Sequence, residues 1–451
     1  MKSLVTNRSM SIFAFAALIA VSLMAALYPT NLPVADKPYD GVMTGNIAWM
    51  LVSTAFVLLM TPGLAFFYGG MVSKSNIIST MLQSFVALGV VTVVWYVVGF
   101  SLAFGDDLNG WGIVGNPGSF FMFNNVGTAP HPTIGAGLPL VLFAAFQLKF
   151  AIITPALITG AFAERINFWG YVLFINLWIV FVYCPLAHMA WHPAGLLALK
   201  GVLDFAGGTV VHISAGCAAL AGALFLGRRK STTGSLPANI PFVILGTGLL
   251  WFGWFGFNGG SALAASEQSV KAFVNTNLAA AIAGITWILL DTVRGKKPSA
   301  LGACIGAVVG LVAITPACGY ITYGPSLFLG ASAACVSNFA AEYFKSGKLD
   351  DTLDVFACHG LGGITGMVFT AFFATSDYWA HTSTGVASHS LLIMQHAIAL
   401  SIVVPFAFGL SYALYKITDL ITPLRVDEAA ETQGLDISQH DESFVESFVG
   451  F

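Results

Sequence analysis

The stretch LDFAGGTVVHISAG, residues Leu203 to Gly216, places two ionisable side chains among small and apolar residues. Asp204 stands directly before the apolar run, and His212 follows eight residues later inside it. Eight residues of α-helix rise about 12 Å, so a helix that begins at Asp204 holds His212 well inside an apolar layer. What surrounds this stretch therefore decides what its two ionisable side chains do.

The composition indicates a protein that crosses a membrane several times. Of the 451 residues, 57% are hydrophobic and 9% are charged, whereas soluble domains carry about 25% charged residues. A net charge of -3 is too small to indicate nucleic acid as a partner. The six cysteines lie in or beside apolar segments and form no CxxC pair. We interpret them as small core residues, not as disulfides or metal ligands.

The apolar segments predict an all-α polytopic membrane protein. A spanning helix needs about 20 predominantly apolar residues, and by this rule eleven spans follow the N-terminal region. We expect a membrane domain over residues 44–425 and a cytoplasmic tail over 426–451. The spans lie near 44–70, 76–104, 138–163, 168–187, 204–227, 239–260, 271–293, 299–315, 322–344, 354–375 and 390–420.

The positions of Lys and Arg predict the orientation. The loops after even-numbered spans hold only Lys200 and Lys271, whereas the loops after odd-numbered spans are rich in cations. Since short cytoplasmic loops carry the excess of positive charge, we expect the C-terminus inside and the mature N-terminus outside the cell. The cations of the odd loops are Lys74, Arg165, Arg228, Arg229, Lys230, Arg294, Lys296, Lys297, Lys345 and Lys348, and Arg425 follows the last span.

Residues 1–28 form a separate apolar segment behind Lys2 and Arg8. They have the features of a cleaved signal peptide, with the sequence SLMAALYP as a mediocre cleavage site. A retained extra helix is the alternative, and both interpretations give the same orientation downstream.

A second stretch, LDVFACHGLGGITG over Leu353 to Gly366, resembles the first. Both begin with Leu-Asp, place a histidine soon afterwards and continue with small residues. Each opens the fifth span of a set of five, and an odd number of spans makes the two halves insert in opposite directions. The sequence therefore predicts a 5+5 inverted repeat with one further C-terminal helix, and a working site near the midplane where the repeats meet.

Two roles are compatible for Asp204. At a helix N-cap, its carboxylate would accept hydrogen bonds from the backbone N–H groups of Ala206 and Gly207 and would suit the positive end of the helix dipole. Its charge would also attract or stabilise a cation.

The histidines point to a pathway through the membrane. Ionisable residues at that depth are rare and mark ion or proton routes, although a lone His212 bonded to a backbone carbonyl would be a simple core residue. His359 in the matching stretch favours a pair that shares a hydrogen between imidazole nitrogens. A zinc site needs three or four ligands, and the only further candidate is Cys358, about 100° round a helix from His359. We expect no metal ion and no cofactor.

Aromatic residues form a second group. Phe146 and Phe150 lie four apart, Trp254, Phe257 and Ser261 follow one another at helical spacing, and Trp191 lies at an external helix end. Such stripes are usually core or interfacial belt. The alternative is a cation–π recognition site at the mouth, closed by stacked phenylalanines. Spacing does not decide between them.

At these residues the sequence resembles the ammonium transporter family (Amt/MEP/Rh). LDFAGGTVVHISAG, followed by GALFLGRR, is similar to the signature of that family. FAIITPALITGAFAERINF, AHMAW, GWFGFNGGSA, AFVNT, GACIGAVVGLVAITPACGYI and DVFACHG are similar to its other segments, in its order. The resemblance runs from about Ile47 into the tail, LRVDEAAETQGLDISQH.

The resemblance implies a role for each matching residue. Trp191, Phe146 and Ser261 match the external ammonium recruitment site, and Phe150 and Phe257 match a two-ring gate. His212 and His359 match the twin histidines of the pore, Trp254 a pore-lining aromatic and Asp204 an acid needed for transport. It also implies a homotrimer with one pore per subunit, located for a bacterial member in the inner membrane, and often blocked by a PII-type regulator from the cytoplasm.

Lys149 departs from the family pattern, because many members carry a small or apolar residue directly before the gate residue. It lies about 100° round the helix from Phe150. At that angle its side chain would either face a subunit contact or snorkel away from the pore. A lysine that faced the pore would repel ammonium.

The sequence thus predicts a transporter, not an enzyme, that strips ammonium of a proton at the mouth and conducts ammonia. Two alternatives remain open. An ammonium sensor would be favoured by an appended signalling domain, whereas about 26 residues follow Arg425. A channel for another small neutral molecule, such as carbon dioxide or water, would be favoured by missing mouth aromatics, and these are present.

Overall fold

The computed structural model describes residues 7–230, 236–346, 349–379 and 386–444. Over these ranges the chain forms helices and no β-strand, only three isolated β-bridges. All eleven predicted spans are helical. Ten helices, one of them α1, are long and apolar enough to cross a membrane, and the shorter α11 (Ala300–Ile314) is apolar as well. The predicted all-α polytopic membrane protein is confirmed.

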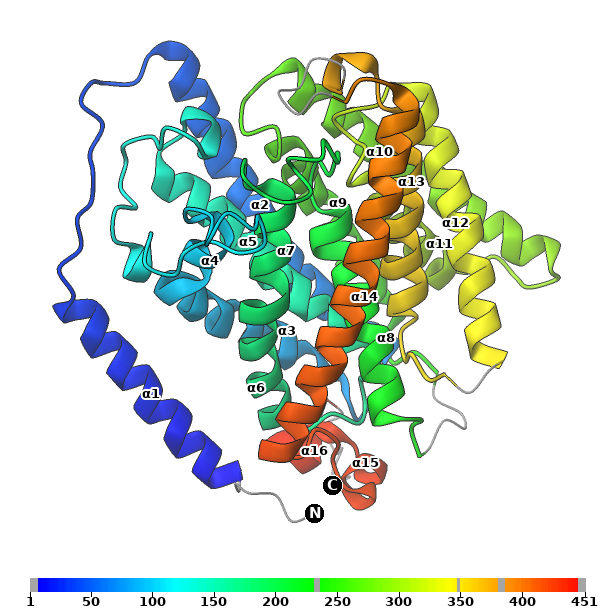
Figure 1. The fold of residues 1–451 in the computed structure, drawn as a ribbon. Coiled ribbons are helices and arrows are strands. Elements are labelled where there is room, and N and C mark those ends of the chain that lie inside the picture. The colour runs from blue at the N-terminus through cyan, green and yellow to red at the C-terminus, as the bar shows by residue number, and fades with distance from the viewer. Residues whose placement is uncertain (1–6, 231–235, 347–348, 380–385, 445–451) are drawn as a thin grey trace.

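The helices follow one another in two sets. The first set is α2 (Gly41–Met71), α3 (Ile77–Val94) continued by η1 (Trp95–Gly99) and α4 (Phe100–Phe104), α5 (Leu140–Ile158) with η4 (Thr159–Ala161), α6 (Phe168–Trp178), η5 (Ile179–Tyr183) and α7 (Cys184–Trp191), then η6 (Gly208–Ile213) with α8 (Ser214–Leu226). The second set is α9 (Ile240–Gly260), α10 (Glu267–Val293), α11, α12 (Tyr323–Ser346), and η7 (Phe356–Leu361) with α13 (Gly362–Phe373). The long α14 (His389–Ile421) follows and crosses the whole bundle (Figure 1).

The two sets meet through small residues. The first helices of the sets, α2 and α9, pack closely because glycines lie between them: a Cβ on Gly63 would come within 2.9 Å of Leu249, and one on Gly70 within 2.6 Å of the Asn239 carbonyl oxygen. Small residues let helix backbones approach each other in membranes.

The two histidine-bearing segments cross in the same way. At the crossing of η6–α8 with η7–α13, Gly216 lies against the backbone of Gly360, and a Cβ on Gly363 would come within 3.1 Å of the His212 Cβ. Both segments begin with a π-helical turn, η6 and η7, and each turn contains its histidine. π-helical turns occur often at functional sites.

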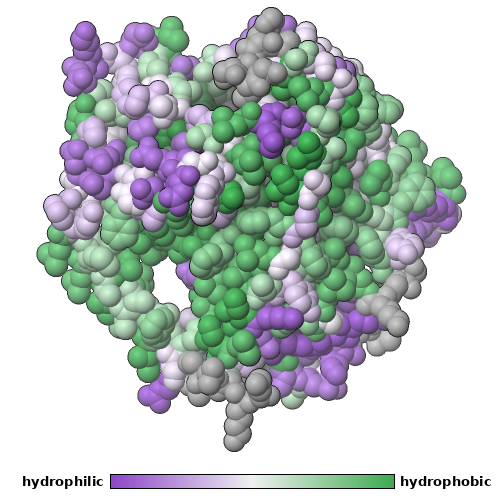
Figure 2. Space-filling view, viewed as in Figure 1, coloured by the Kyte–Doolittle hydropathy of each residue, from purple (hydrophilic) through white to green (hydrophobic). Residues whose placement is uncertain are grey.

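The N-terminal helix α1 (Asn7–Leu27) stands beside the bundle with its side chains exposed or half-buried (Figure 1). It is as apolar as a membrane span, and a space separates part of it from the other helices in Figure 2.

The C-terminal tail folds back onto the end of the bundle at which α3 begins. It forms α15 (Glu428–Gln433) and α16 (Leu435–His440). The Asp436 carboxylate accepts hydrogen bonds from the backbone N–H groups of Ile78 and Ser79 at 3.1 and 2.8 Å, so the tail caps the start of α3. Arg425 anchors the connection through Glu431, at 2.9 Å.

Candidate functional site

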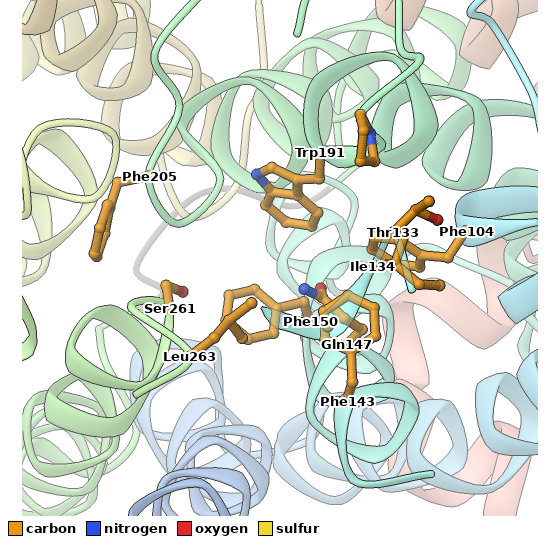
Figure 3. A pocket seen from close by; sticks show the side chains of 12 residues that line it. Phe104, Thr133, Ile134, Phe143, Gln147, Phe150, Trp191, Phe205, Ser261 and Leu263 are labelled. Carbon is orange, nitrogen blue, oxygen red and sulfur yellow. The ribbon is translucent and has the colours of Figure 1, made fainter. Parts of the chain in front are cut away.

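A cavity of about 180 Å³ lies where α5 begins and α7 ends, on the side of the bundle opposite the tail. Its wall is mainly aromatic and apolar, with Gln147 and Ser261 as polar members, and the side chains converge on it in Figure 3. The lining residues are Phe104, Thr133, Ile134, Gly135, Phe143, Gln147, Phe150, Trp191, Pro193, Phe205, Ser261 and Leu263. None of these described lining residues carries a charged side chain, so a bound cation would interact with ring faces and polar oxygens.

Three of the residues matched to the recruitment site and the gate line this cavity: Trp191, Phe150 and Ser261. Trp191 is held by a hydrogen bond from its indole Nε1 to the backbone oxygen of Asp204, at 3.1 Å. The Ser261 hydroxyl donates to the Phe257 carbonyl oxygen at 2.8 Å, which leaves its lone pairs available. Phe146 is fully buried behind Phe150 and is not on the wall, where Phe143 of the preceding turn takes its place.

The floor of the cavity is a stacked pair of phenylalanines. The rings of Phe150 and Phe257 lie 4.2 Å apart between centroids at an interplanar angle of 30°. Both side chains are buried, and Phe146 supports Phe150 from the side at 4.9 Å. The stacked pair separates this cavity from the residues beyond it.

The two histidines lie directly beyond the phenylalanine pair. The Nδ1 atoms of His212 and His359 are 3.3 Å apart, with one ring donating and the other accepting. The ring of His212 is stacked on Trp254 at 5.5 Å and lies 6.1 Å from Phe257. The expected pairing of the histidines across the repeat is therefore present, with both rings buried.

Thr315 completes the polar chain. Its Oγ1 lies 3.3 Å from His212 Nε2 and accepts from Trp254 Nε1 at 2.9 Å. The same hydroxyl donates to the Leu311 carbonyl oxygen at 2.8 Å. Sequence reasoning did not single out Thr315, because a hydroxyl four residues from a helical carbonyl usually bonds only to that carbonyl.

Beyond His359 a narrow cavity of about 10 Å³ continues towards the tail side, lined by residues that include Tyr68, Cys358 and His359. This volume is near the lower limit of a space that holds one water molecule. Cys358 and His359 are neighbours in the chain and both contribute to this wall.

Asp204 caps its helix, although not in the expected way. Its carboxylate accepts from the backbone N–H groups of Gly207, Gly208 and Thr209 at 2.9, 2.6 and 2.8 Å, and from the Thr209 hydroxyl. The expected bond from Ala206 is absent, because the helix begins at Gly208, after Gly207 has turned at a φ of +117°. A left-handed φ of this kind favours glycine.

The structural counterpart of Asp204 is Asp351, which sequence reasoning missed. Its carboxylate accepts from the Phe356 N–H at 2.7 Å, five residues on, as Asp204 accepts from Thr209. Asp351 precedes His359 by eight residues, the spacing of Asp204 and His212. The shared Leu-Asp dipeptide had instead aligned Asp354, which pairs with Lys345 at 3.0 Å. The signal in the sequence was this eight-residue spacing from acid to histidine.

Asp351 differs from Asp204 in how completely it is bonded. Among the residues that the structure describes, its Oδ1 finds no hydrogen-bond partner. Burial, followed by the charge of Asp354, raises the pKa of Asp351 to about 7. A carboxyl group at this end of the histidine path can therefore take or release a proton near neutral pH.

An ion-pair cluster fixes the loops around this end. Arg229 bonds to Glu164 at 2.7 Å and to Asp350 at 2.9 Å. Burial alone would raise the pKa of Asp350, but the hydrogen bonds and charge of Arg229 hold that pKa below its ordinary value. Arg165, fully buried beside this cluster, donates to the Asp350 carbonyl oxygen at 2.6 Å.

Lys149 lies on another face of α5. It is half-buried, in line with the half-buried Ala145 and Val141 four and eight residues before it. It is not on the wall of either cavity. The structure therefore supports the interpretation in which Lys149 points away from the path.

Known proteins are similar to this chain in both sequence and fold. The model of the Ammonium Transporter Family matches residues 48–444. The ammonium transporter of Aquifex aeolicus is 44% identical over 401 residues, which cover 88% of this chain and 93% of that protein. The crystal structure of Saccharomyces cerevisiae Mep2 matches with a TM-score of 0.82 at 33% identity, over 90% of this chain and 93% of Mep2. A structure titled Sensor Amt Protein matches with a TM-score of 0.81 at 30% identity, over 88% and 98%.

Proposed function

This chain belongs to the ammonium transporter family, and from that premise we propose how its residues carry ammonium across the membrane. Ammonium binds in the aromatic cavity, gives up a proton there to solvent water at the cavity mouth, and crosses as ammonia past Phe150 and Phe257 to the histidine pair. The observation that carries this proposal is the continuous order of aromatic cavity, stacked phenylalanines and bonded histidines along one line. Residues 44–425 form the transport domain, and residues 426–451 form a regulatory tail.

The cavity suits a small cation that leaves its charge behind. The ring of Trp191, the face of Phe150 and the hydroxyl of Ser261 offer cation–π and hydrogen-bond partners without a fixed anion on the wall. Burying an ammonium-sized charge beyond this point costs several kcal/mol in a low-dielectric medium. The stacked rings of Phe150 and Phe257 offer little to offset that cost, so the neutral form passes more easily.

The histidine pair gives ammonia polar partners in an apolar neck. One imidazole nitrogen donates and the other accepts across the 3.3 Å contact. The pair can therefore form hydrogen bonds with ammonia, which also both donates and accepts. Potassium has no proton to give up and remains charged, and for that reason it is excluded.

Asp204 supports the site from behind the wall. Its carboxylate is buried, and its four hydrogen bonds hold the start of η6. Its backbone oxygen also positions Trp191. Through this link to Trp191 the residue adjoins the wall, and its charge would favour a cation there, so the cap and the electrostatic role are compatible.

We further infer the setting of the protein in the cell. Asp350, Arg229 and the tail gather at one end of the bundle, and the cation-rich loops predict that this end faces the cytoplasm. The cavity then opens to the outside of a bacterial inner membrane. A homotrimer with one pore per subunit, and a PII-type regulator that docks at the tail end, are the partners we propose.

Uptake of methylammonium in a host that lacks its own ammonium transporters tests the path. We expect Trp191→Ala to raise the KM and Phe257→Ala to change the maximal rate, because the first lines the cavity and the second closes its floor. A Trp191→Ala protein with an unchanged KM would contradict recruitment in this cavity.

The sensor alternative rests on one observation, the match to a structure titled Sensor Amt Protein. The same cavity would bind ammonium in a sensor, but flux would be low. Growth of the transporter-deficient host on limiting ammonium separates the two roles, because a sensor with little flux does not restore growth.

Lys149 provides a prediction with a small effect. Because Lys149 is absent from both cavity walls, Lys149→Met should change the KM and maximal rate for methylammonium by less than about twofold. Uptake assays at matched membrane levels measure this, with Phe150→Ala as the responsive comparison. A large rise in uptake would show that the lysine charge opposes the substrate in the conduction path.

The tail provides a second prediction. Deleting residues 426–451 removes the Asp436 cap of α3 and should reduce uptake or abolish control by the regulator, while the protein still reaches the membrane. Asp436→Ala, which removes the two bonds to Ile78 and Ser79, should reproduce part of the effect. Glu442→Gln on the exposed end of the tail is the matched control. Wild-type uptake and control in the deletion variant would refute a role for the tail.

A further inference from the structure

The linker between α1 and α2 is attached to the loop that forms one side of the external cavity. Backbone bonds join the Asn125 N–H to the Asn31 oxygen at 2.7 Å and the Ala129 N–H to the Pro33 oxygen at 3.0 Å. The Tyr39 hydroxyl donates to the Thr128 carbonyl oxygen. In Figure 1 the dark blue linker runs along the outer side of the cyan loop.

Asn31 makes the densest of these contacts. Its backbone N–H donates to the Asn124 side-chain oxygen at 2.7 Å, and its own Nδ2 donates to the Asn125 side-chain oxygen at 3.0 Å. Together with its backbone oxygen, Asn31 satisfies three polar groups of the loop. An exposed linker that merely connected two helices would need none of these bonds.

The loop passes the attachment on to the cavity. On the side opposite the linker, the Gly127 and Ala129 carbonyl oxygens accept from the N–H groups of Val141 and Leu140, at 3.0 and 3.2 Å. These residues begin α5, which carries Phe143, Gln147 and Phe150 into the cavity. The loop itself adds Thr133, Ile134 and Gly135 to the wall, as the right-hand side of Figure 3 shows for the first two.

The fit between linker and loop is tight at Gly127. A Cβ at this position would overlap the Pro33 carbonyl oxygen and come within 2.6 Å of the Pro33 nitrogen. The backbone of Gly127 is not left-handed, so alanine is excluded there by the linker and not by its own φ. This contact supplies a way to loosen the linker by a single methyl group.

We propose that residues 31–39 are a strap of the mature protein that holds the external loop in place and thereby sets how well the cavity captures ammonium. The proposal rests on the recruiting role assigned to the cavity. It also limits processing, because removal of residues 1–28 keeps the strap whereas cleavage within residues 31–39 would remove it.

The first test is the N-terminus of the protein purified from membranes. Intact-mass and N-terminal peptide mass spectrometry should find a start at or before Asn31. Both a cleaved signal peptide and a retained α1 satisfy this. A start at Asp36 or later would overturn the proposal, because the bonds from Asn31 and Pro33 would be absent from the working protein.

The second test compares two glycine substitutions. Gly127→Ala displaces the strap, whereas Gly45→Ala in α2 places a methyl group where nothing lies within 4 Å. We expect Gly127→Ala to raise the KM for methylammonium about threefold to tenfold at a maximal rate within about twofold of wild type, since loss of one or two hydrogen bonds gives effects of this order. Gly45→Ala should match the wild type in both constants.

A labelling experiment reports on the loop directly. Thr133→Cys introduces a thiol in the cavity wall, while the native cysteines are buried or half-buried. A membrane-impermeant maleimide added from outside should label it faster when Gly127→Ala is also present, with unmodified protein as the blank. Asn31→Ala, which removes one side-chain bond, should shift the rate in the same direction and replaces Gly127→Ala if that variant fails to reach the membrane.

The outcomes separate the strap from the cavity. If Gly127→Ala and Asn31→Ala keep the wild-type KM and labelling rate while Trp191→Ala raises the KM, the strap proposal is wrong and the recruiting cavity stands. If Trp191→Ala also leaves the KM unchanged, the recruiting role of the cavity is itself wrong. A fall in maximal rate alone, at constant KM, would make the strap a purely structural element and overturn its proposed role.

Discussion

Asp204→Ala is expected to lower methylammonium uptake about 100-fold at an unchanged amount of protein in the membrane. The substitution leaves three backbone N–H groups and the Thr209 hydroxyl without their acceptor in a buried position. Hydrogen bonds to a charged group contribute about 1.5–3 kcal/mol each, and about 3 kcal/mol corresponds to roughly 100-fold in a rate. The same change removes the negative charge of a buried carboxylate whose own backbone oxygen bonds Trp191 of the cavity wall.

Asp204→Asn separates the cap from the charge. The amide oxygen can still accept from Gly207 and Gly208, but the NH2 group would face the Thr209 N–H, and the carboxylate charge is lost. We expect this variant to fold and to retain at most about a tenth of the uptake, because the electrostatic attraction is gone. Uptake of methylammonium and thermal stability in detergent are the two measurements.

A matched control for the cap is Asp40→Ala. Asp40 is the exposed N-cap of α2 and accepts from the Met43 N–H at 2.7 Å, far along the chain from the histidine pair. Its loss should cost the usual stability of a cap, about 1 kcal/mol, and leave transport intact. Wild-type transport by Asp204→Asn would mean that the carboxylate charge plays no part and that Asp204 only caps a helix.

The spans were predictable because lipid imposes a simple condition. Every backbone polar group in the membrane must be bonded within its own helix, so each long apolar run, such as Leu140–Ile158, becomes a helix. The inverted repeat was predictable from two short stretches, because both carry a histidine at the same crossing point. Where each helix begins was less certain, and the start at Gly208 instead of Asp204 is an example.

Other features depend on geometry that a sequence does not carry. The π-helical turns at His212 and His359 widen the helix, and spacing rules for an α-helix do not predict them. Asp351 escaped attention because the dipeptide Leu353–Asp354 offered a better local match than an acid two positions before it. The folding of the tail onto α3 rests on side-chain bonds between residues far apart in the chain, such as Asp436 to Ser79.

The sequence alone does not predict which of the aromatic residues line the cavity. Spacing left the stripes undecided between core and cavity, and the structure divides them. Phe146 is core, Trp191 and Ser261 are wall, and Phe150 is both wall and floor. Helical spacing gives the face on which a side chain lies, but the loops that reach over that face decide whether a cavity exists there.

The histidine pair provides the prediction with the largest change in selectivity. Replacing both residues, His212→Asp with His359→Glu, puts two carboxylates where neutral imidazoles now meet at 3.3 Å. Rings of acidic side chains are the usual lining of cation channels, and the loss of the two bulkier imidazole rings leaves room for water. We expect the double variant to pass potassium at a rate at least about tenfold above the host background, while wild-type protein passes none.

The control must separate charge from shape. His212→Asn with His359→Gln replaces the same rings by neutral amides that match the two acids in length. The neck then gains space and polar groups but no charge. This variant should carry ammonium slowly and still exclude potassium, because a desolvated potassium ion gains too little from neutral amides to offset its lost hydration. Parallel uptake of methylammonium and of a potassium tracer decides the result.

If the acidic pair carries ammonium and still excludes potassium, selectivity resides before the histidines. Trp191, Phe150 and Phe257 would then be the residues that reject the ion, since they are the last side chains that a cation meets before His212.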